Sequence, residues 1–128
     1  MFRAMTTLAP YHSISVDPEW AELHFSIGGY WSLEAMSEFL HALGDAAKPF
    51  IKEGRSFDAI GDLHDFVAQS RETADAIRNS LLLAQKNGMR RFAVVAPPAL
   101  VKLQYRRLTE GLDAEFFEDE ASARTWLR

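Results

Sequence analysis

Residues 12–28, HSISVDPEWAELHFSIG, carry the pattern that decides the fold. Apolar and polar side chains alternate in His12–Val16 and again in Trp20–Gly28. Alternation with a period of two is typical of a strand that buries one face. Between the two segments lies Asp17-Pro18-Glu19, whose Asp and Pro suit the first two positions of a tight turn. The sequence therefore predicts an antiparallel hairpin with one buried face.

Beyond this hairpin the spacing of apolar residues alternates between that of helices and that of short strands. Further strands are predicted at residues 57–63, 92–96 and 114–117. Four helices are predicted to begin after N-terminal signals, namely Ser32, Ser70, Pro98 and Asp119. The first helix is expected to end at Pro49 and Gly54, the second at Gly88 and the third at Gly111.

This order, β-β-α-β-α-β-α-β-α, predicts an α/β domain with a five-stranded mixed sheet. The first hairpin is expected to be antiparallel and the remaining strands parallel, because each is reached through a helical crossover. No repeat or linker divides the chain. We expect residues 1–10 to form a flexible N-terminus and residues 11–128 to form a single domain.

Composition excludes several classes of function. The chain has 128 residues, no cysteine and a formal net charge of −4. Without cysteine it has no disulfides or thiolate metal sites, which fits a reducing, cytoplasmic location. An acidic balance argues against general nucleic-acid binding. The most apolar stretch, Phe92–Val101, is interrupted by two prolines and is far shorter than a membrane span, so no membrane insertion is expected.

Several stretches carry a resemblance to a known family. They are IGGYW at 27–31, residues 57–70, FAVV at 92–95 with LQYRRL at 103–108, and Phe116-Phe117 followed by residues 121–127. The chain resembles the STAS domains, and among these the stand-alone bacterial SpoIIAA-like proteins. The resemblance implies the sheet described above. It also implies a non-catalytic module that binds a protein, as anti-sigma-factor antagonists do, with a second copy of the chain among the possible partners.

In signalling STAS domains, a Ser or Thr at the start of the helix after the third strand is phosphorylated by a partner kinase. The family pattern there is Asp-Ser-Ser-Gly, whereas this chain has Gln69-Ser70-Arg71-Glu72. Only Ser70 matches. A phosphate at a helix N-terminus is favoured by free N–H groups, with Arg71 attracting it and Glu72 repelling it. The alternative is that Ser70 serves only as a helix cap, which we favour.

Asp62, His64 and Asp65 follow the third predicted strand, at the edge of the sheet where ligands of α/β proteins gather. Two carboxylates and an imidazole are compatible with a metal site or an acid/base pair. No second cluster accompanies them, and a solvated loop is the favoured interpretation. We therefore expect no catalytic residue, no metal and no other cofactor, and we treat these residues as candidates for a partner surface.

Apolar residues add further candidates for a surface that binds a ligand or partner. Tyr30 and Trp31 form a possible aromatic patch, although Trp31 also suits a hydrophobic staple at the first helix. Leu82 lies in a leucine run too wide for one helical stripe. With Phe66 and Val67, it suggests either a dimer surface or a lipid-facing groove, while packing on several sides explains it equally well.

A second function therefore stays open beside the interaction module. The fold is similar to CRAL-TRIO lipid-transfer domains, and the aromatic and leucine positions are suited to lining a cavity for a small apolar or lipid-like ligand. An enzyme built around Asp62 and His64 is the third and least favoured hypothesis.

Overall fold

The computed structural model describes residues 9–96 and 99–128. Five strands of these residues form one sheet, in the order β1-β2-β3-β4-β5. The hairpin of β1 and β2 is antiparallel, and every later pair is parallel. The predicted fold class is therefore confirmed. The strands are β1 (Tyr11–Asp17), β2 (Glu22–Gly28), β3 (Phe57–Asp62), β4 (Met89–Val95) and β5 (Ala114–Phe117).

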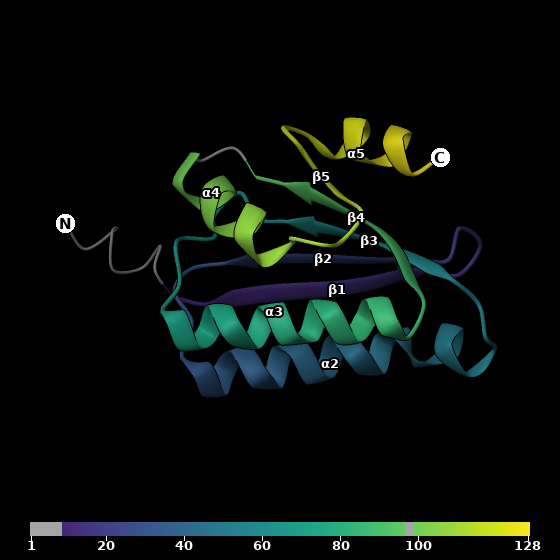
Figure 1. Ribbon diagram of the computed structural model, residues 1–128, viewed down its shortest axis with the longest axis horizontal. Coiled ribbons are helices and arrows are strands. Elements are labelled where there is room, and N and C mark those ends of the chain that lie inside the picture. Colours follow the sequence, from purple (N-terminus) through teal and green to yellow (C-terminus); the bar gives the residue numbers. More distant parts are fainter. Residues whose placement is uncertain (1–8, 97–98) are drawn as a thin grey trace.

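The helices are divided unequally between the two faces of this sheet (Figure 1). They are α2 (Leu33–Lys52), α3 (Arg71–Lys86), α4 (Ala99–Leu108) and α5 (Glu120–Leu127). Because each crossover between neighbouring parallel strands is right-handed, and because the strands follow one another in chain order, α2, α3 and α4 come to one face. Of the helices in the described residues, α5, which follows the last strand, is the one that packs on the other face, against β3, β4 and β5.

The main hydrophobic core lies between the sheet and the three crossover helices. Phe25 and Phe92 stack there with their ring centroids 6.0 Å apart, and Val94 is fully buried. Position 61 of β3 requires glycine, because a side chain at this position would collide with the ring of Phe25. On α2 the buried side chains include Phe39 and Phe50, which face this core.

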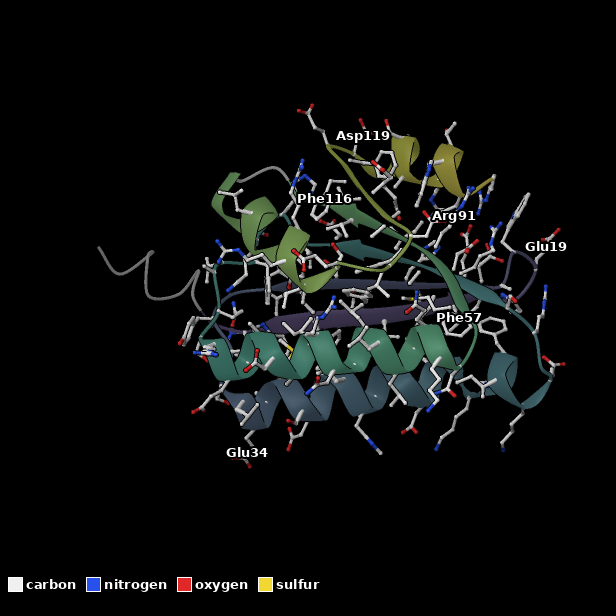
Figure 2. All side chains as sticks on the ribbon, viewed as in Figure 1. Glu19, Glu34, Phe57, Arg91, Phe116 and Asp119 are labelled. Atoms are coloured by element: carbon white, nitrogen blue, oxygen red, sulfur yellow. The ribbon has the colours of Figure 1, made fainter. Side chains whose placement is uncertain are left out.

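The opposite face of the hairpin is less open than the sequence predicted. Glu22 was expected on a solvated face, but it is only 1% exposed. Its carboxylate accepts hydrogen bonds from Arg128 at 2.8 Å and pairs with His24 at 2.9 Å. Arg91 reaches α5 from β4 and donates to the carbonyl of Trp126 at 2.9 Å (Figure 2). The last helix therefore covers part of this face through charged contacts that a local pattern does not reveal.

Other predicted boundaries shift by a few residues. β2 begins at Glu22 rather than Trp20, because the turn extends through Ala21, whose φ is +53°. Pro49 does not end α2, which continues to Lys52 because Phe50 beyond it is 2% exposed in the core. The predictions for Pro98 and for residues 1–8 lie outside the described residues.

Candidate functional site

The candidate site lies where β2 and β3 end and their connections to α2 and α3 run side by side. The backbone N–H of Gly29 donates to the carbonyl of Asp65 at 2.8 Å, and Gly29 forms a parallel bridge with Phe66. The two connections therefore extend the parallel pairing beyond the strands themselves. Ligands of α/β sheets commonly bind at this edge.

The side chain of Gln69 holds these connections together. Its Oε1 accepts from the backbone N–H of Trp31 at 2.9 Å, and its Nε2 donates to the carbonyls of Gly29 at 3.0 Å and Val67 at 2.6 Å. Gln104 of α4 adds a reciprocal pair of bonds to the Gln69 backbone, at 3.1 and 3.2 Å. Gln69 is 7% exposed, and its amide is fully used. The sequence gives no sign of this role, because no local pattern marks a Gln that bonds distant backbone groups.

Ser70 caps α3, as the sequence predicted. Its Oγ accepts from the backbone N–H of Thr73 at 3.3 Å and donates to the Thr73 hydroxyl at 3.1 Å. Thr73 in turn donates to the carbonyl of Trp31 at 3.3 Å, which connects the cap to the start of α2. Ser70 remains half-buried, whereas the next residue, Arg71, is exposed. The first residues of α3 are therefore accessible to a partner at Arg71 and in part at Ser70.

The polar residues after β3 form two separate pairs. His64 Nδ1 lies 2.6 Å from Asp62 Oδ1, and these side chains are 44% and 48% exposed. Asp65 turns instead to Tyr11 of β1, whose hydroxyl donates to Oδ2 at 2.6 Å. Within residues 9–96 and 99–128, no three His, Asp or Glu side chains are arranged to hold a metal ion.

The position of Tyr11 depends on the glycine that ends β2. A side chain at Gly28 would collide with the ring of Tyr11, so its absence lets the ring cross the sheet towards Asp65. The hydrogen bond to Asp65 raises the pKa of Tyr11 to about 12, with smaller contributions from burial and from the negative charges of Asp65 and Asp62. This pair ties the first strand to the loop after β3.

Two of the predicted surface residues are in the core. Trp31 is 4% exposed, and its indole N–H donates to the carbonyl of Gly28 at 2.8 Å. Phe66 is 1% exposed and packs edge-on against Tyr105, with ring centroids 5.7 Å apart. Both were candidates for a ligand or partner surface, and their burial rules out that role in this structure, whereas for Trp31 the favoured alternative was a hydrophobic staple at α2. Long-range contacts bury these rings where the two connections meet.

The remaining candidates divide into two places. Tyr30 is 47% exposed at the end of β2, close in sequence to Trp31, and Val67 is half-buried in the loop that carries His64 and Asp65. Leu82 is 39% exposed but lies twelve residues beyond Ser70, about 18 Å along α3 at 1.5 Å per residue. The structure therefore separates Leu82 from the rest. We call Tyr30, His64, Asp65, Val67 and Arg71 the α3-start surface.

A second feature is an apolar cavity of about 150 Å³ between α2, α3 and the sheet. Its walls come from both helices, from the inner faces of β2, β3 and β4, and from Tyr105 of α4. Ser80, Asn87 and Tyr105 are the polar side chains among the described residues that line it. Phe57, labelled in Figure 2, is another wall residue. No sequence motif marks this cavity, which exists only because the helices pack on the sheet.

The comparisons with known proteins agree with this fold. A family model described as SpoIIAA-like matches residues 6–128, and the chain belongs to this family. No curated protein matches the chain. Within the described part of the chain, no helix combines the length and apolar character needed to span a bilayer.

Two solved structures share the architecture. One is an uncharacterized protein of the DUF3478 family with a SpoIIAA-like fold from Shewanella loihica PV-4, at 21% identity and a TM-score of 0.66, covering 94% of this chain and 96% of that one. The other is an anti-sigma factor antagonist from Mycobacterium paratuberculosis, at 14% identity and a TM-score of 0.58, covering 92% and 95%. At these identities the likeness establishes the fold.

We predict that Gln69→Ala destabilises the protein by about 2 kcal/mol or more, because it leaves buried N–H and C=O groups without partners. Urea unfolding measures the change. Gln85→Ala is the matched control, since Gln85 is exposed and makes one bond, to the carbonyl of Gly111 at 3.2 Å. Equal stabilities of the two variants would contradict the role given to Gln69.

We predict that Tyr11 titrates near pH 12 and that Asp65→Asn lowers its pKa towards 10. Because the folded pKa is raised, Tyr11 stabilises the fold fully below pH 10, and this contribution is lost as the pH rises through about 12. NMR titration of the Tyr11 ring carbon gives the pKa in both proteins. An unchanged titration in Asp65→Asn would refute the assignment.

Proposed function

We propose that this protein is a non-catalytic regulatory module that binds a protein partner through the α3-start surface. The observation that carries the proposal is a capped and rigidly held helix start, with Tyr30 and Arg71 exposed beside it, in the fold of an anti-sigma factor antagonist. Exposed aromatic and Arg side chains are enriched at protein interfaces. The position is also where the STAS resemblance implies recognition.

Rigidity supports binding at this surface. Gln69, Ser70 and Tyr11 each fasten a connection that would otherwise be mobile, so little conformational entropy is lost when a partner binds. The polar groups are paired with one another rather than directed at a common point, which favours recognition over catalysis. A second copy of the chain is one candidate partner. The cysteine-free sequence is compatible with a cytoplasmic location, which forms part of this proposal.

Ser70 is the residue through which such binding would be regulated. Its hydroxyl now caps α3, and a phosphate there would be favoured by the helix N-terminus and by Arg71 but opposed by Glu72. Asp is also a good N-cap, so Ser70→Asp retains the cap while adding a charge. Ser70→Ala removes the cap without adding charge. The two variants therefore separate capping from charge.

We expect a photocrosslinking residue at position 30 to give a discrete protein adduct in the native cells, and Arg71→Glu to abolish that adduct. Mass spectrometry identifies the product, and an adduct of twice the chain mass would make the partner a second copy. The control carries the crosslinker at position 41, where His41 is 81% exposed on α2. An adduct that forms equally from both positions, or none from position 30, would argue against this surface.

Under regulation at Ser70, the adduct weakens in Ser70→Asp and persists in Ser70→Ala, provided that both variants are folded by circular dichroism. Mass spectrometry of the native protein should also detect phosphate on Ser70 in at least one growth condition. Full adduct formation by Ser70→Asp would remove the regulatory part of the proposal while leaving the binding surface in place.

The apolar cavity favours a second function, the binding of a small apolar ligand. An apolar cavity of about 150 Å³ is large enough to hold a molecule the size of benzene. Gly44 on α2 is exposed and lines this cavity, and a side chain added there would meet no neighbour within 4 Å. The cavity is therefore open to solvent beside α2, which gives a ligand a path of entry.

We predict that native mass spectrometry of freshly purified protein detects a bound small molecule in addition to the bare chain. Gly44→Phe should lose it, because the added ring obstructs the opening while the helix keeps its packing. Ser37→Phe, at another exposed position on α2, is the control. Bare protein alone in both the wild type and the control would count against ligand carriage.

A further inference from the structure

Tyr105 carries a buried hydroxyl that has no hydrogen-bond partner among the described residues. The residue is 2% exposed, and its hydroxyl makes no hydrogen bond among the residues whose side chains are described. Native proteins rarely leave a buried polar atom unpaired, because such a group loses water without compensation. Burial also raises the pKa of Tyr105, so the hydroxyl stays protonated and able to donate. Tyr105 is also one wall of the apolar cavity.

The other walls restrict what the cavity can accept. Among the described lining residues there is no Asp, Glu, Lys, Arg or His. A carboxylate, phosphate or ammonium group inside would be desolvated without an opposite charge, at a large cost. A volume of about 150 Å³ matches a single ring rather than a long acyl chain. Both properties argue against an intact fatty acid or phospholipid.

We propose that the cavity binds a small neutral molecule with an apolar body and one hydrogen-bonding group, which pairs with the hydroxyl of Tyr105. This inference rests on the ligand-binding function proposed above and names its chemical class. The apolar body occupies the space between α2, α3 and the sheet, and its polar atom approaches α4 through a small adjustment of the tyrosine ring. Tyr105 thereby selects among apolar molecules of equal size.

Phenol and toluene are suitable probes, because they have nearly the same shape and differ only in that toluene carries a methyl group in place of the hydroxyl of phenol. Their dissociation constants are measured by NMR titration of the wild type and of Tyr105→Phe. We expect phenol to bind Tyr105→Phe about tenfold more weakly than the wild type, as loss of one hydrogen bond predicts, and toluene to bind both alike. Without ligand, Tyr105→Phe should unfold at the same temperature as the wild type or higher, because it removes an unpaired polar atom.

The outcomes separate this inference from the function on which it rests. Binding of both probes with no change in Tyr105→Phe would overturn the role of Tyr105 and leave ligand carriage standing. Binding of neither probe to the wild type at millimolar concentration would reject both. A clearly lower melting temperature for ligand-free Tyr105→Phe would mean that the hydroxyl already has a partner, and it would overturn the inference by itself.

Discussion

The handedness of the crossovers is the constraint on which this structure depends. β2 to β5 follow one another in chain order, and right-handed connections bring α2, α3 and α4 to the same face of the sheet. Because β2 to β5 are parallel, their carboxyl ends and the loops that follow lie along a single edge. The handedness also places the two long helices α2 and α3 side by side on one face of the sheet (Figure 1). The cavity lies between these helices and the strands. The opposite face is left to α5 and to charged side chains such as Glu22.

At the carboxyl edge of the sheet, hydrogen bonds between distant segments hold the loops in place, and among the described residues they leave no cluster of polar groups directed at one point. Gln69 connects the ends of two strand–helix units, and Tyr11 is held by Asp65 across 54 residues of chain. Asp62 pairs with His64, Asp65 with Tyr11, and Gln69 with the backbone, so these groups are not free to act on a substrate. What the edge presents outward is a rigid rim with Tyr30 and Arg71 exposed, and such a rim is suited to recognising another protein.

The cavity reflects a balance between large and small side chains. Phenylalanines come to it from the sheet and from α2, and the two helices also contribute small residues, including Gly44, Ala47 and Ala84. Small residues let α2 and α3 approach each other but leave unfilled volume below them. Protein interiors are normally packed to crystalline density, so a void of this size is lost contact energy unless something occupies it. Tyr105 is consistent with an occupant that has one polar atom.

Local spacing in the sequence was sufficient to determine the order of strands and helices and the caps at Ser32, Ser70 and Asp119, while the family followed from resemblance in several longer stretches. These features depend on neighbouring residues, whose periodicity and turn chemistry are visible in the chain. Of the candidate site, the sequence predicted the capped helix start and the loop with Asp62 and His64. Only the tertiary structure decided that Trp31 and Phe66 are buried, that Gln69 joins the loops, and that a cavity exists beside Tyr105. Most of these depend on contacts between segments that are far apart in the chain, such as the 5.7 Å approach of Phe66 to Tyr105, and spacing along the chain does not encode such contacts.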